Sequence, residues 1–276
     1  MNLLESATDD ISSGYVFDPG WDRETERLRT NEALWDPGTV ARFDQIGVAP
    51  GWSCLEVGAG YGSAAQWLAD RVGPGGRVVA TDLEVERLGW LSGHQVEVWC
   101  HDLRSDDLPA DAFDLIHSRM LIQHLPDREA AIARLVRALR PGGTLFLEDT
   151  DSLPLFRSFR STDFLQDVRE AGYGLMAQAG HEPRGGHFDL QAARALGLNA
   201  QADGRVVMVR GGSPQARHYM LWLDYMRPRI LAAGLLTAER IDEALAEMAD
   251  PENYWLSQIL ISTIARRPSG SPGAGR

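Results

Sequence analysis

Leu55-Glu56-Val57-Gly58-Ala59-Gly60-Tyr61-Gly62-Ser63 is the stretch that decides the fold. It continues an apolar run over residues 53–57 and leads into a helical pattern over residues 64–72. A strand, a glycine turn and a helix in this order begin an α/β nucleotide-binding unit. The glycines allow positive φ angles and leave room for a ligand against bare backbone. The start of the helix adds unpaired N–H groups.

Composition narrows the class of protein. The chain has 276 residues, of which 44% are hydrophobic and 24% charged, as in a soluble globular protein with a sizeable core. Its formal net charge of −12 argues against a nucleic-acid binder, which normally presents a basic face. All 27 basic residues are arginine, so no lysine is available as a Schiff base, general base or phosphate ligand.

Sequence features that depend on the cellular compartment favour a cytoplasmic protein. Cys54 and Cys100 each lie in or beside an apolar run, which predicts two buried, reduced thiols rather than a disulfide. Residues 1–10 are acidic and lack the apolar region of a signal peptide. The sequence contains no run of eighteen apolar residues, so we expect no membrane-spanning helix. The low-complexity tail over residues 268–276 is expected to be disordered.

Strand and helix patterns alternate from residue 53 to residue 148. The expected strands are 53–57, 77–81, 96–100, 113–117 and 144–148, and the expected helices are 63–72, 84–91 and 128–139. Alternation of this kind predicts a mainly parallel sheet with right-handed crossovers. Before it, a helix over 22–35 is expected to break at Asp36-Pro37-Gly38 and to resume over 39–46.

The regular alternation of strand and helix patterns ends after residue 148. The patterns predict a helix over 163–179, a helix over 188–196, a strand over 205–209, two helices within 215–249 around Ala233-Gly234, and a last strand over 255–265. Long excursions near the carboxyl ends of strands are usually lids. We therefore divide the chain into a helical flap (1–47), a core (48–151, 187–212 and 251–267), helical insertions (152–186 and 213–250) and a tail (268–276).

The glycine spacing distinguishes between ligands. A dinucleotide fingerprint needs Gly or Ala at position 63, where this chain has Ser63. This disfavours an NAD-dependent oxidoreductase. Asp82 ends the second expected strand, where a carboxylate can accept hydrogen bonds from both ribose hydroxyls, and Asp102 follows the third.

With these features in place, the sequence resembles the class I S-adenosylmethionine-dependent methyltransferases. The segments that carry the resemblance are LEVGAGYGS, VVATDL, HDL, FDLIHSRMLIQHL and LRPGGTLFLED, over roughly residues 45–150. The resemblance implies a Rossmann-like, doubly wound sheet of seven strands. The sheet would be mainly parallel with an antiparallel last strand, and helical lid insertions would be added to it.

The resemblance also implies a cofactor site for S-adenosylmethionine. Asp82 would hold the ribose hydroxyls, Leu83 would lie against the adenine, and Asp102 and the backbone of Leu103 would bond the adenine edge. The aminoacyl and ribose parts would contact the end of the first strand and its glycine loop, at Glu56, Gly58, Gly60 and Gly62. His117 and Ser118 would lie near the methionine amino group and the methyl group.

Methyl transfer is an in-line displacement, so alignment in a water-poor pocket is the main task of the site. A base is needed only for a poorly acidic hydroxyl or a protonated amine. The candidate catalytic residues are His117, His124 and His181, and further possible bases are His187, Glu148, Asp149 and Asp151. The acidic trio lacks an evident partner by spacing, so no metal is expected.

The acceptor is less well defined. The insertions contain Phe156, Phe159, Phe164, Tyr173, Met176, Tyr219, Trp222, Tyr225 and Met226, which fit either an enclosed apolar cavity or ordinary helix packing. We expect a small organic acceptor methylated at O, N, S or C, such as a specialised metabolite, and a monomer or homodimer without nucleic-acid or membrane partners. The alternative is a protein that binds the cofactor but acts as a cyclase, a decarboxylase or a regulatory binder.

Overall fold

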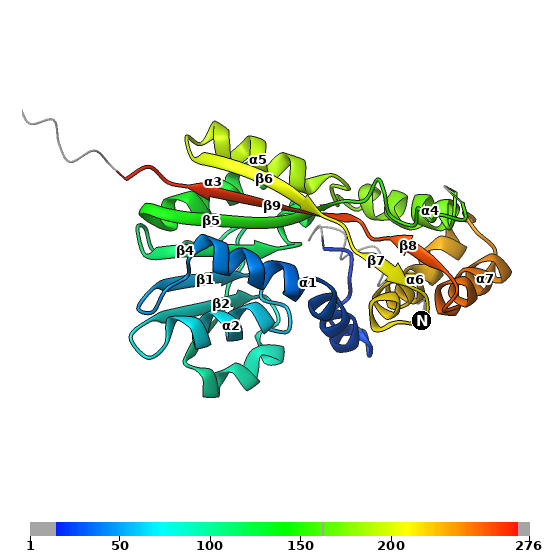
Figure 1. Cartoon of the computed structure of the whole chain (residues 1–276), viewed down its shortest axis with the longest axis horizontal. Helices are drawn as coiled ribbons and strands as arrows, with labels where there is room; N and C mark the ends of the chain where they lie inside the picture. Colours follow the sequence, from blue (N-terminus) through cyan, green and yellow to red (C-terminus); the bar gives the residue numbers. More distant parts are fainter. Residues whose placement is uncertain (1–14, 162, 270–276) are drawn as a thin grey trace, which may run out of the picture.

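The computed structural model describes residues 15–161 and 163–269. The acidic segment 1–10 and residues 270–276 of the predicted tail lie outside the described residues. A seven-stranded sheet runs through the molecule (Figure 1). Its strands are β1 (Ser53–Val57), β2 (Arg77–Asp82), β3 (Val96–Cys100), β4 (Phe113–Arg119), β5 (Leu139–Asp151), β6 (Asn199–Arg205) and β9 (Ile259–Arg266).

The strand order is β3-β2-β1-β4-β5-β9-β6. Strands β1 to β5 pair in parallel, and β9 pairs antiparallel with both β5 and β6. The predicted fold class, a mainly parallel seven-stranded sheet with an antiparallel last strand, is confirmed. The order reverses beside β1, and ligands of open α/β sheets bind at such a switch point.

Helices cover both faces of the sheet because its central strands are apolar on both sides. All five residues of β1 are buried. One face packs against α2 (Ser63–Val72), η2 (Val85–His94) and the end of α1 (Glu24–Ile46). The other face packs against α3 (Arg128–Ala138) and α5 (Gly185–Ala195). Strands buried on both faces are typical of doubly wound folds.

A group of elements that we call the lid is stabilised by an apolar core of its own. It joins α4 (Gln166–Gln178), α6 (Pro214–Ala232) and α7 (Ala238–Ala249) to the small antiparallel pair β7 (Met208–Arg210) and β8 (Tyr254–Leu256). Figure 1 shows these elements grouped beyond one end of the main sheet. The fully buried Trp35 of α1 and Trp255 of β8 belong to the same core, so α1 connects the lid with the sheet.

Two expectations about strands and one about the burial of a cysteine were wrong. The strand predicted over 205–209 is β6 followed by β7, and the last strand is divided into β8 and β9. Strand β6 pairs with β9 and strand β7 pairs with β8, and Ser257 lies between the two pairs. Its backbone N–H donates to Val207 O and its hydroxyl accepts from Val207 N, both at 2.9 Å. Cys100, expected to be buried, is exposed, whereas Cys54 is buried; both are free thiols. Among the described residues, no helix has the length and apolarity to cross a membrane.

Helix α1 does not break at Asp36-Pro37-Gly38. It runs through Pro37 as one helix of 23 residues. Tertiary contacts on both sides of the proline explain the continuity: before it, Trp35 is fully buried in the lid core, and after it, the buried Thr39 donates to Glu148 Oε2. Packing of this kind outweighs the local preference of proline against a helix interior.

Pro37→Ala is expected to stabilise the protein by about 1–2 kcal/mol. The substitution restores a backbone N–H donor at an exposed helical position, which outweighs the entropy that proline removes from the unfolded chain. Urea unfolding of the two proteins checks the free energy of unfolding. Lower stability in the variant would show that the packing of α1 requires the proline geometry.

Candidate active site

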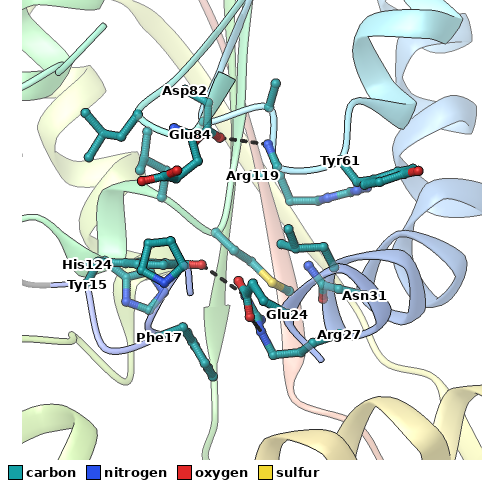
Figure 2. Close-up of a pocket in the computed structure, with 18 of the residues that line it drawn as sticks. Tyr15, Phe17, Glu24, Arg27, Asn31, Tyr61, Asp82, Glu84, Arg119 and His124 are labelled. Carbon is teal, nitrogen blue, oxygen red and sulfur yellow. Dashed lines mark hydrogen bonds and ion pairs between the residues drawn. The ribbon is translucent and has the colours of Figure 1, made fainter. Parts of the chain in front are cut away.

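A cavity of about 800 Å³ lies at the carboxyl ends of the central strands. Its lining comes from α1, from the loops that follow β1, β2, β3 and β4, and from helices α4 and α6 of the lid. Figure 2 shows Asp82 and Glu84 at one end of this cavity and Tyr15, Phe17 and His124 at the other. The cavity therefore lies between the sheet and the lid.

The glycine loop after β1 forms part of the cavity wall. Gly58, Gly60 and Gly62 have φ angles of 69°, 61° and 100°, which only glycine adopts without strain. A Cβ at Gly58 would approach Leu121 to 3.0 Å. Gly58 and Gly60 line the cavity, whereas Gly62 is the residue before α2 and is not among the lining residues.

Two carboxylates follow neighbouring strands at the cavity edge. Asp82 accepts hydrogen bonds from Gly60 N at 2.9 Å and from Glu84 N at 3.1 Å, so its two oxygens are held by the turn. Asp102 pairs with Arg104 at 2.7 Å, and this hydrogen bond holds the pKa of Asp102 below its usual range. Both carboxylates line the cavity, as do Leu83 and Leu103.

The end of β4 differs from the sequence-based placement. His117 and Ser118 are buried and are not among the lining residues; Arg119 and Met120 line the cavity instead. Ser118 Oγ donates to Val57 O at 3.0 Å. His117 lies behind Glu56, which does line the cavity, with its Nδ1 2.6 Å from Glu56 Oε2.

The opposite end of the cavity is built by the start of α1 and the segment before it. Arg27 donates to both oxygens of Glu24 at 2.7 Å and to the Tyr15 hydroxyl at 3.0 Å. The guanidinium also lies 3.8 Å from the centre of the Phe17 ring. Glu24 and Arg27 are nearly inaccessible to solvent, whereas Tyr15 is partly exposed. This end therefore presents a neutral phenol beside a compensated ion pair.

Neutral histidines complete this end. The rings of His124 and His181 pack 4.7 Å apart, and the Tyr15 ring lies 5.3 Å from that of His124. His124 belongs to the short 3-10 helix η3 (Ile122–His124) after β4. Burial lowers the pKa of His124 well below its usual value, lowers that of His181 to about 4, and lowers that of His218 to about 3. All three line the cavity as imidazoles that are uncharged at neutral pH.

Among the lining residues that sequence reasoning did not single out are Tyr15, Arg27, Arg119 and His218. The only available signal for the first two was the mixture of aromatic and charged residues before the first strand. Arg119 follows His117 by two positions, and extension of the expected strand to 119 would have shown that it lies on the same side of the sheet. His218 carried no signal, because its place depends on how α6 packs.

The three acids of β5 point apart. Glu148 bonds Thr39 and Ser262, Asp149 accepts from Gln123 N at 2.7 Å, and Asp151 lies 2.8 Å from His187 Nε2. In the described parts of the chain, no three His, Cys, Asp or Glu side chains are grouped as metal ligands.

The aromatic residues of the insertions divide between two roles. Tyr173, Met176 and Trp222 line the cavity, whereas others, including Phe156, Tyr219 and Met226, pack in the lid core. Phe159 is 80% exposed. Both expectations for this group, an apolar cavity wall and ordinary helix packing, are therefore partly met.

A family model described as a methyltransferase domain matches residues 21–207. Phosphoethanolamine N-methyltransferase 3 of Arabidopsis thaliana is 29% identical over 138 residues, which cover 48% of this chain and 27% of that one. Nocamycin O-methyltransferase of Saccharothrix syringae is 33% identical over 129 residues, which cover 44% of this chain and 46% of that one. The matches thus span less than half of both relatives.

Among solved structures, phosphoethanolamine N-methyltransferase 2 of Haemonchus contortus aligns with a TM-score of 0.55. The alignment covers 88% of this chain and 57% of that one, at 16% identity. At this identity, the likeness concerns the fold.

Proposed function

Because this chain belongs to the class I S-adenosylmethionine-dependent methyltransferase family, we propose that it transfers a methyl group to an uncharged small organic molecule. The observation that carries this proposal is the two-ended cavity. One end has a glycine loop with Asp82 and Asp102 at neighbouring strand ends, and the other has neutral imidazoles under a lid. The first suits an adenosyl group, and the second suits an organic acceptor.

The residues present fit S-adenosylmethionine. Asp82 would bind the ribose hydroxyls, because each of its oxygens retains a lone pair after bonding the turn. Asp102 and the backbone of Leu103 would bond the adenine edge, with Leu83 against its face, and Glu56 would lie toward the aminoacyl part. The segment before residue 48 would act as a flap, since Tyr15, Glu24 and Arg27 close the far end.

When bound, S-adenosylmethionine supplies an electrophilic methyl group on a sulfonium. The chain would contribute alignment and exclusion of water, through the glycine loop on one side and the lid on the other. His124 is the best-placed of the predicted bases, because it is neutral, lines the cavity and packs against Tyr15 and His181. It would take the proton from an acceptor hydroxyl as the methyl group is transferred.

The ion pairs of the lining arginines disfavour a phosphorylated acceptor. The lining arginines Arg27, Arg104 and Arg119 are paired with Glu24, Asp102 and Asp36, and Arg87 donates to Pro19 O. A phosphate group is normally bound by arginines or other cations whose charge is available to it. We therefore propose a hydroxylated specialised metabolite, in line with the nocamycin relative, rather than a phosphorylated amine.

Calorimetric titration with S-adenosylmethionine, S-adenosylhomocysteine and NAD tests the cofactor assignment. We expect saturable binding of the first two and none of NAD, because Asp82 is present but the dinucleotide spacing is not. Binding of NAD without a response to the other two would contradict the proposed function.

Formation of S-adenosylhomocysteine with a panel of acceptors separates methyl transfer from regulatory or non-methylating roles. The panel contains phosphoethanolamine and hydroxylated aromatic and polyketide molecules. Product with an uncharged hydroxyl compound supports the proposal. Methylation of phosphoethanolamine would refute the uncharged acceptor while leaving the cofactor assignment intact.

A further inference from the structure

A buried hydrogen-bonded triad lies directly behind the cavity wall. His117 of β4 lies between Glu56 of β1 and Glu148 of β5, with Nδ1 2.6 Å from Glu56 Oε2 and Nε2 3.3 Å from Glu148 Oε2. The three side chains are at most 4% exposed. Of the three, only Glu56 lines the cavity, and its second oxygen, Oε1, has no hydrogen-bond partner among the described residues.

The triad is tied to helix α1. Thr39 Oγ1 donates to Glu148 Oε2 at 2.5 Å, and Ser262 Oγ donates to Glu148 Oε1 at 2.7 Å. Arg119 donates to Thr39 at 2.8 Å and to Asp36 at 2.9 Å. Glu148 is therefore held by groups from α1 and β9 as well as by His117, which makes it a fixed anchor.

Burial of this charged triad costs folding free energy. The His117 ring lies 4.9 Å from that of Phe43 and 4.8 Å from that of Phe146, in the apolar layer between sheet and helices. Replacement of a buried charged group by apolar residues is often neutral or stabilising, so stability alone does not account for it. Burial would lower the pKa of His117, but Glu56 and Glu148 outweigh it and raise the pKa to about 9. His117 is thus an imidazolium at neutral pH and donates from both nitrogens.

Strand order indicates which part of the cofactor would lie at Glu56. If Asp102 after β3 takes the adenine and Asp82 of β2 takes the ribose, the remaining aminoacyl part extends toward β1 and β4. Glu56 lies there, next to the glycine loop. Its free oxygen can accept a hydrogen bond from the ammonium group of the cofactor, a charge-assisted contact that depends on its orientation.

We propose that His117 is a positioning residue that anchors Glu56 to Glu148 and so holds its free oxygen toward the aminoacyl group of the cofactor. The inference rests on the proposed function. His117 acts through Glu56 and does not itself face the cavity.

Two amide variants of His117 test the proposal. In His117→Asn the amide nitrogen takes the place of Nδ1 and keeps the bond to Glu56; in His117→Gln it takes the place of Nε2 and bonds Glu148 only. Calorimetry measures binding of S-adenosylhomocysteine and of 5′-methylthioadenosine, which lacks the aminoacyl part. We expect His117→Gln to weaken the first ligand about tenfold or more and the second less than about threefold. His117→Asn, which keeps the bond to Glu56 but loses the one to Glu148, is expected to weaken the first ligand clearly less than His117→Gln does.

A purely structural role would affect the two ligands or the two variants equally, and either result would overturn the proposal. Should His117→Gln not fold, nitrogen-15 NMR of the histidine rings in the wild-type protein decides the matter. The His117 ring, identified with His117→Asn, should carry two N–H protons at pH 8, and a neutral ring would overturn the proposal. Wild-type protein that binds neither ligand would refute the proposed function itself.

Discussion

Asp82→Ala is expected to weaken S-adenosylhomocysteine binding by about 100-fold or more, because two hydrogen bonds from ribose hydroxyls to a carboxylate are lost. The change also removes the acceptor for Gly60 N and Glu84 N, so the glycine loop loses its support. Both effects act on the same end of the cavity. Calorimetry at fixed pH and salt measures the dissociation constant.

Asp102→Ala is the matched control for this prediction. Asp102 lies at the end of the neighbouring strand and also lines the cavity, but it would make a single contact with the adenine edge and is already paired with Arg104. The loss of affinity in Asp102→Ala should be clearly smaller, and thermal unfolding should show that both variants are folded at the temperature of the titration. Unchanged affinity in Asp82→Ala would refute the ribose assignment.

The first five strands and the glycine loop are predictable from the sequence because their signals are local. Residues 53–57 and 96–100 are bounded by turn residues, and the observed strands have the same limits. The positive φ angles after β1 require glycine, so the glycines of the sequence predict the turn directly.

Elements stabilised by long-range pairing were harder to predict. Strand β6 reads Asn-Ala-Gln-Ala-Asp-Gly-Arg, a poor strand sequence, and forms because it pairs with β9 from Asn199 to Arg205. The site shows the same limit. His117 was expected at the cavity, but its register places it opposite Glu56 on one side and Phe146 on the other, within the apolar layer. That outcome depends on which strands flank β4, which no local pattern shows.

His124→Gln is expected to lower kcat by about 10²–10⁴-fold with an acceptor from the panel that carries a hydroxyl, and to leave cofactor affinity within about twofold. The variant keeps a polar side chain of similar length but cannot take up a proton. Because His124 belongs to the acceptor end of the cavity, loss of its basicity should affect the chemical step and not the adenosyl contacts. Single-turnover kinetics measures the step directly.

The pH dependence of the methyl-transfer rate is a second measurement that tests His124 as the base. Burial, and then the neighbouring His181, lower the pKa of His124 well below its usual value, so the neutral form persists as the pH falls through 6.5. The wild-type rate should therefore stay level through mildly acidic pH and fall only at the lower folded pKa. His187→Gln is the matched control: His187 is also a histidine of the predicted set, but it bonds Asp151 and does not line the cavity. Equal losses of kcat in the two variants would contradict a base at His124, because only one of these rings can reach an acceptor.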